Sequence, residues 1–80
     1  MIFPVGTIVK YDPPLFNEQF FEITGHLYNF LENKTLKYRL ENFRYKYPIH
    51  SYVYNLNISL ASPEEKHSFL LRKFGNVLEN

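Results

Sequence analysis

Strict alternation of apolar and charged side chains marks the segment Leu36-Lys37-Tyr38-Arg39-Leu40-Glu41. Successive side chains of an extended chain point to opposite faces, so a period of two is typical of a half-buried β-strand. The pattern places Leu36, Tyr38 and Leu40 toward the interior and their charged neighbours toward solvent. It predicts a strand at the centre of the chain and a sheet built around these apolar residues.

Weaker strand patterns flank this segment on both sides. Val5-Gly-Thr-Ile-Val-Lys-Tyr11 is rich in β-branched residues, and we expect it to end at Asp12-Pro13-Pro14 because proline has no amide hydrogen for a ladder. Gly25 interrupts the pattern of residues 19–28 at a position where a bulge would bend the strand. Two further strands are expected at residues 50–54 and 56–60.

A helix start is encoded in Ser62-Pro63-Glu64-Glu65. Serine is a preferred N-cap, proline suits the first helical position, and a glutamate three residues after the cap can bond back to the cap amide. One helical face is indicated by the spacing of His67, Leu70, Leu71 and Phe74. We expect this face to pack on the sheet.

The end of the helix is predicted at Gly75, because glycine is the commonest residue just after a helix C-terminus. Arg72 and Lys73 would then lie in the last turn, where the helix dipole favours cations. Phe69 lies off the apolar face, so it either widens the buried stripe or marks a contact with a partner or a second copy.

The order of these elements resembles that of the small SH3-like barrels, which include KOW, Tudor and SH3 domains. Four segments carry the resemblance: Val5-Gly-Thr-Ile-Val-Lys-Tyr11, Phe21-Glu-Ile-Thr-Gly25, Tyr38-Arg-Leu-Glu-Asn42 and Val53-Tyr-Asn-Leu-Asn-Ile-Ser-Leu60. The resemblance implies a mainly β fold, a five-stranded SH3-like small barrel over residues 1–61 with one C-terminal α-helix over residues 62–75. We expect a single domain over residues 1–80. The chain has no tryptophan, so the aromatic groove with which SH3 domains bind polyproline is not expected.

The composition fits one small domain held together by aromatic packing. The chain has 80 residues with 8 Phe, 7 Tyr and no Cys, which excludes a disulfide framework and thiolate metal sites. Its histidines are too far apart for a local metal motif, and no phosphate loop or nucleophile motif is present. We therefore expect no enzyme activity, no cofactor and no metal. No basic segment precedes a long apolar one, which predicts a cytoplasmic protein that does not insert in membranes.

The candidate binding site is a cluster of basic and aromatic side chains in and after the central strand. Its members are Lys37, Arg39, Arg44, Tyr45, Lys46 and Tyr47. Cations that meet phosphates and rings that stack on bases are the combination that binds single-stranded nucleic acid. Tyr and Arg are also enriched at protein interfaces, and Lys37 and Arg39 are equally explained as the solvated outer face of a strand.

We expect a protein partner rather than nucleic acid, because the net charge is only +1. The leading hypothesis is a non-enzymatic protein-binding module, and the alternative is an RNA- or DNA-binding barrel that uses the basic-aromatic strand and loop. Residues with AT-rich codons are abundant, which favours a phage or mobile-element protein, an inhibitor that covers a surface of a host defence or nucleic-acid enzyme. A homodimer formed through a sheet edge or the helix is a third hypothesis.

Overall fold

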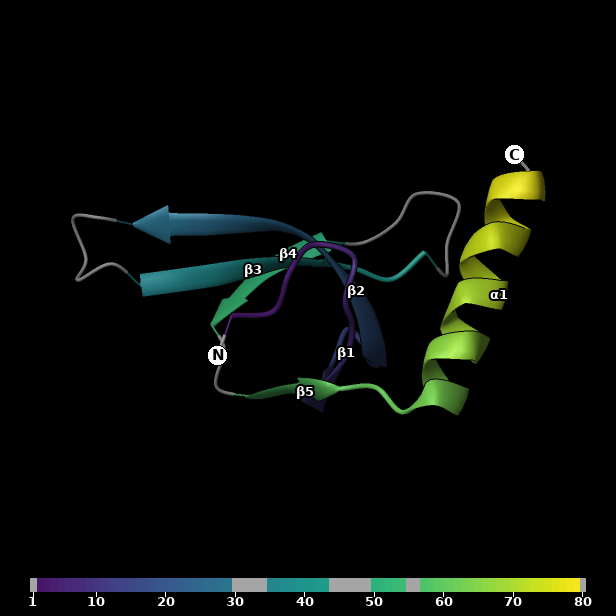
Figure 1. Ribbon diagram of the computed structural model, residues 1–80, viewed down its shortest axis with the longest axis horizontal. Coiled ribbons are helices and arrows are strands. Elements are labelled where there is room, and N and C mark those ends of the chain that lie inside the picture. The colour runs from purple at the N-terminus through teal and green to yellow at the C-terminus, as the bar shows by residue number, and fades with distance from the viewer. Residues whose placement is uncertain (1, 30–34, 44–49, 55–56, 80) are drawn as a thin grey trace.

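Five strands and one C-terminal helix make up the structure, a computed structural model that describes residues 2–29, 35–43, 50–54 and 57–79. The elements in chain order are β1 (Ile8–Leu15), β2 (Glu18–Asn29), β3 (Thr35–Glu41), β4 (His50–Tyr54), β5 (Ile58–Leu60) and α1 (Pro63–Glu79) (Figure 1). The strands form one antiparallel sheet in the order β4-β3-β2-β1-β5. This confirms the predicted mainly β class. Among the described residues no pairing joins the edge strands β4 and β5.

The core lies on one face of this sheet. Its buried members come from four of the strands and are Val9, Phe21, Ile23, Tyr38, Leu40 and Val53. The alternation predicted for β3 is confirmed, because Tyr38 and Leu40 are buried while Lys37 and Arg39 are partly exposed. We call the face that carries the core the inner face and the opposite one the outer face.

The buried Tyr38 ring is covered by the N-terminal segment. The amide of Phe3 donates a hydrogen bond to the Tyr38 hydroxyl (3.0 Å), and the Nε2–H of His26 donates one to the Phe3 carbonyl oxygen (2.7 Å). The His26 ring also meets the Tyr38 ring edge to face, with centroids 5.4 Å apart. The backbone amide and carbonyl groups of Phe3 are therefore both hydrogen-bonded at the margin of the core.

A bulge bends β2 where the sequence predicted it. The pairing of β2 with β3 shifts register between Ile23 and Gly25, so Thr24 is the extra residue. Figure 1 shows the strong curvature of β2 along its length. The bulge lets one long strand pair with β1 at one end and with β3 at the other.

The expected end of β1 at Asp12 is wrong, because the strand continues through both prolines to Leu15. Proline lacks an amide donor, and the register with β2 is irregular between Lys10 and Leu15, yet the chain stays extended and pairing resumes at Leu15 with Glu18. A two-residue turn then joins the strands, with both Phe16 (φ 54°) and Asn17 (φ 62°) in the left-handed region.

The predicted helix start is confirmed in atomic detail. The Ser62 amide donates to Glu65 Oε1 (2.8 Å), and the Glu65 amide donates to Ser62 Oγ (3.2 Å). This reciprocal pair is a capping box. The hydrogen bond from the Ser62 amide holds the pKa of the Glu65 carboxyl below its ordinary value.

Removing the cap by Ser62→Ala is expected to lower the free energy of unfolding by about 0.5–2 kcal/mol, because the Glu65 amide loses its acceptor. Urea unfolding followed by far-UV circular dichroism measures the change. Ser68→Ala, an exposed site within the helix, is the matched control and should differ from the wild type by less than about 0.5 kcal/mol. Equal midpoints for the two variants would contradict the capping role of Ser62.

The predicted end of the helix is wrong, and of its predicted buried face only Leu70 is even half-buried. Gly75 lies inside α1, which runs to Glu79, so Arg72 and Lys73 are not in its last turn. Phe69 is the buried apolar side chain (3% exposed), whereas Leu71 (62%) and Phe74 (56%) face away from the sheet. The helix is therefore rotated relative to the predicted apolar stripe.

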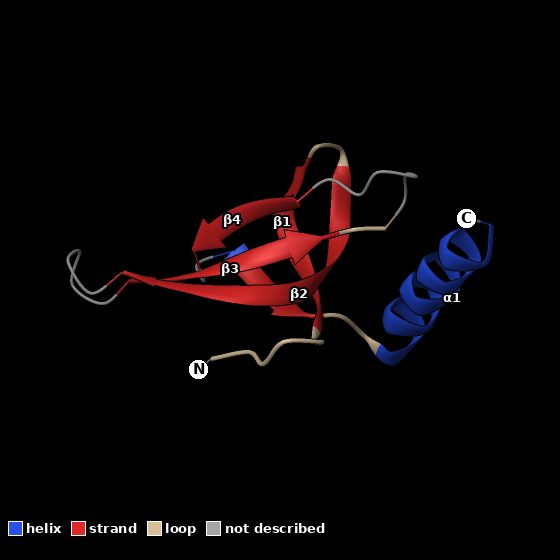
Figure 2. Ribbon diagram, turned by 90° about the horizontal axis from the view of Figure 1, so that it is seen from above, coloured by secondary structure: helices blue, strands red, loops and turns tan. Residues whose placement is uncertain are grey.

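Two ion pairs accompany that rotation. Lys73 Nζ lies 2.7 Å from Glu22 Oε1, and Arg72 Nη1 lies 3.9 Å from the buried Glu18 carboxylate. Glu22 lies opposite Ile8 of β1 and opposite Glu41 of β3, so its side chain points to the outer face. The Phe69 ring of the helix packs edge to face on Phe43, with centroids 6.1 Å apart. Helix α1 thus lies against the outer face near β1 and β2, at one end of the sheet (Figure 2).

Candidate interaction surface

The structure places two of the six predicted binding residues, Lys37 and Arg39, on the outer face of β3. The other four lie outside the described residues: Arg44, Tyr45, Lys46 and Tyr47. The predicted cluster therefore stays a prediction as a whole. The environment of its first two members is defined.

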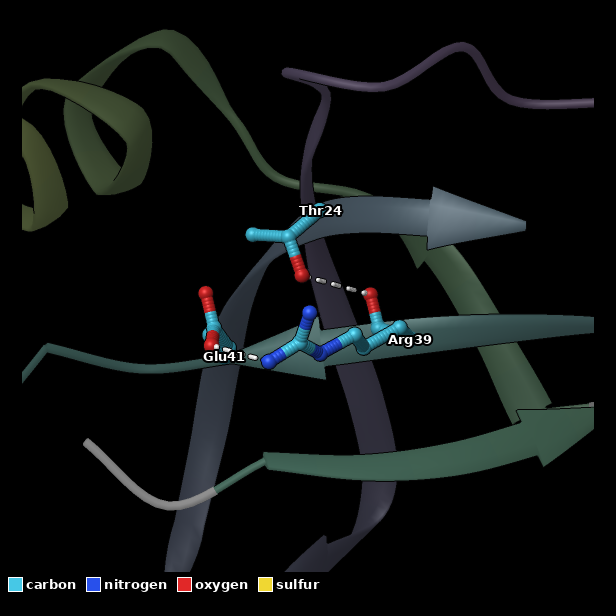
Figure 3. A network of polar contacts seen from close by, with 3 residues as sticks. All are labelled: Thr24, Arg39 and Glu41. Carbon is cyan, nitrogen blue, oxygen red and sulfur yellow. Dashed lines mark hydrogen bonds and ion pairs between the residues drawn. The ribbon is translucent and has the colours of Figure 1, made fainter. Parts of the chain in front are cut away.

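Arg39 is tied into the sheet. Its Nη2 atom lies 3.1 Å from Glu41 Oε1, two residues along the same face, and Thr24 Oγ1 donates to the Arg39 carbonyl oxygen at 3.5 Å (Figure 3). The bulge in β2 brings Thr24 to this position. Glu41 therefore offsets the charge of Arg39, and the Arg39 guanidinium is not a free cation.

Lys37 lies over an aromatic ring of the neighbouring strand. Its ammonium is 4.8 Å from the centroid of the Tyr54 ring, and the two residues are direct partners in the ladder between β3 and β4. Leu27 of β2 is the partner of Lys37 on its other side. Direct partners share a face, so these three side chains form a row across three strands of the outer face.

This row and Arg39 together form an exposed patch, which we call the outer patch and define as Leu27, Lys37, Arg39 and Tyr54. Leu27 and Tyr54 each have about half of their area exposed. Neither was predicted as a site residue, because their place beside Lys37 depends on the strand register. The alternation of charges in β3 predicted only the lysine and the arginine.

Two ion pairs lie between the outer patch and the helix. Glu41 and Glu22 are partners in the ladder between β2 and β3, Glu41 pairs with Arg39, and Glu22 pairs with Lys73 of α1. Each carboxylate is therefore matched by one cation. The outer face is divided into a part covered by α1 and a part where the outer patch remains accessible.

A concave feature lies beside α1, away from the outer patch. It has a volume of about 300 Å³, and its walls are Phe20, Glu64, Glu65, Ser68, Phe69 and Arg72. Two of its charged groups are already engaged, Glu65 with the cap and Arg72 with Glu18. The parts of the chain that the structure describes contain no group of three or more His, Asp or Glu side chains placed to hold a metal ion. Within those same parts, no helix combines the length and hydropathy needed to span a bilayer.

The chain matches no protein-family model, no curated protein and no solved structure.

Proposed function

We propose that the protein is a non-enzymatic binding module that contacts another protein through the outer patch. The observation that carries this proposal is the pairing of exposed apolar and aromatic area with compensated charge. Leu27 and Tyr54 offer that area, while Arg39 is matched by Glu41. Tyrosine and arginine are among the residues that contribute most to protein interfaces.

The architecture that we propose for this module is a small SH3-like barrel. The sheet order, with β1 between β2 and β5, and the bend of β2 at Gly25 are compatible with a sheet that curls over the inner face. The C-terminal helix would then be an addition on the outer face. The predicted binding residues Arg44, Tyr45, Lys46 and Tyr47 remain part of this proposal as a prediction from the sequence.

A second candidate function is binding of single-stranded RNA or DNA. The observation that favours it is the stacking of Lys37 on the Tyr54 ring, because a cation beside an exposed ring can serve a phosphate and a base together. The two functions differ in their response to salt. Contacts to phosphates weaken steeply as salt rises, whereas an aromatic protein interface is much less sensitive.

The test is affinity capture from the lysate of a low-GC bacterium, with and without nuclease and at low and high salt. We expect the wild type to retain a discrete protein that resists both treatments. The double variant Leu27→Ser, Tyr54→Ala should retain at least about tenfold less of it, because the interface loses its apolar centre. Val5→Ser, at an exposed residue outside the outer patch, is the matched control and should behave as wild type.

Titration with fluorescent single-stranded oligonucleotides decides the alternative. Affinity for the oligonucleotide that falls with salt and is lost with Lys37→Ala and Tyr54→Ala would replace the protein-binding proposal. Equal capture by the wild type and the double variant would exclude the outer patch as the contact surface. Melting curves of every variant ensure that only folded proteins are compared.

A further inference from the structure

An exposed aromatic residue occupies a backbone conformation that suits it poorly. Phe16 sits at the first position of the β1–β2 turn with φ of 54°, and 55% of the residue is exposed. A left-handed conformation is unfavourable for a residue with a side chain, and asparagine or glycine occupies it more readily. Folding of the hairpin therefore favours a different residue at this position.

The position also distinguishes Phe16 from the other exposed apolar side chains. Within residues 2–29, 35–43, 50–54 and 57–79, positive φ outside glycine occurs only at Phe16 and Asn17. Asn17 is a residue type that tolerates this conformation. An exposed phenylalanine that adds strain and contributes little burial is explained by a role outside the fold.

The residues on both sides of the turn contact the rest of the fold. Leu15 packs against the core cluster and pairs with Glu18 in the ladder. The Glu18 carboxylate is buried and lies 3.9 Å from Arg72 of α1, so the hairpin is braced by the helix directly behind the turn. A ring presented on a fixed base loses little conformational freedom when it binds, which favours affinity.

The surroundings of the ring indicate the chemistry of its partner. Pro13 and Pro14 are exposed on the strand that leads to the turn, and the neighbouring exposed charge is that of Asp12. We define Pro13, Pro14 and Phe16 as the hairpin tip. An apolar tip beside a carboxylate fits an apolar pocket with a basic rim and is repelled by an anionic lipid surface.

From this geometry we infer that the hairpin tip is an anchor, and that the Phe16 ring inserts into an apolar, basic-rimmed pocket on the protein partner. The inference rests on the proposed protein-binding function and deepens it, because it adds a contact at the end of the sheet away from the outer patch. The inference requires that the Phe16 ring increase the affinity for the partner while it lowers the folding stability of the protein.

The test separates these two contributions with a pair of variants in the same turn. Phe16→Asn removes the ring and relieves the strain, so we expect its melting temperature to rise by about 4–8 °C. Its affinity for the protein captured by the wild type should fall by about thirtyfold, as for a central anchor. Asn17→Gly relaxes the turn but keeps the ring, and it should bind as wild type; Phe16→Trp should retain binding.

The possible failures can be told apart. A wild type that captures no protein defeats the proposed function and the inference with it. Capture by Phe16→Asn at wild-type affinity defeats the anchor alone and leaves the outer patch in place. Equal losses in Phe16→Asn and Asn17→Gly would assign the effect to turn conformation rather than to the ring. Binding of the wild type to phosphatidylserine vesicles that is lost in Phe16→Asn would assign the tip to a membrane surface and overturn the inference.

Discussion

Leu40→Asp is expected to abolish folding of the whole domain. Leu40 is fully buried in the inner face and pairs with Ile23, another fully buried residue, directly across the ladder between β2 and β3. The substitution removes a buried side chain, which costs about 2–5 kcal/mol, and introduces an unpaired carboxyl group, which costs several more. A chain of this length has a total stability of about 4–12 kcal/mol, so little or none would remain.

Lys37→Asp is the matched control, because it places the same carboxylate on the same strand but on the outer face. It loses the contact with Tyr54 and should cost no more than about 1 kcal/mol. Thermal melts and the near-UV circular dichroism of the tyrosines report both variants. A cooperative, wild-type-like transition for Leu40→Asp would mean that the inner and outer faces of β3 are assigned the wrong way round.

The strands were predictable because their signals are local. Alternation at Lys37, Tyr38 and Arg39 follows from the pleat alone, and Gly25 predicted the bulge because a residue without a side chain suits an irregular ladder. The prolines of β1 gave a wrong prediction of where the strand ends. Proline forbids a ladder hydrogen bond, but it does not forbid an extended chain, and β1 passes through both prolines before pairing again.

The face of the helix could not be predicted from its apolar spacing. Phe69 is the one apolar residue that the spacing placed off the buried stripe, yet it is the one that the sheet buries. In this orientation Arg72 and Lys73 also meet charged partners, and both partners are more than fifty residues away in the sequence. The charged ends of Arg72 and Lys73 also lie over the Phe69 and Phe43 rings, contacts that the spacing of apolar residues does not indicate.

Only part of the candidate site could likewise be predicted from the sequence. Lys37 and Arg39 could be found because outward-facing positions follow from one strand alone. Leu27 and Tyr54 join them only through the registers of two strand pairs, and one of these registers is shifted by the bulge. The Phe16 turn was missed because phenylalanine is not among the residues that indicate a two-residue hairpin.

Phe69→Ala is expected to lower the free energy of unfolding by about 3–5 kcal/mol, the usual cost of deleting a buried aromatic ring. Only 3% of Phe69 is exposed, and its ring meets Phe43 edge to face while the Arg72 guanidinium lies 5.1 Å above it. Without the ring, α1 keeps the ion pairs of Arg72 with Glu18 and of Lys73 with Glu22 but loses its buried aromatic contact with Phe43. The helix should therefore detach before the sheet unfolds, and hydrogen exchange should show lost protection in α1 first.

Phe74→Ala removes the same ring from the same helix at a position that is 56% exposed, and it should change the free energy of unfolding by no more than about 0.5 kcal/mol. The pair of variants distinguishes the two possible orientations of α1, because the apolar spacing alone predicts the reverse ranking. Urea unfolding of both proteins gives the two free energies on one scale. A greater loss in Phe74→Ala than in Phe69→Ala would mean that the helix packs through its apolar stripe rather than through Phe69.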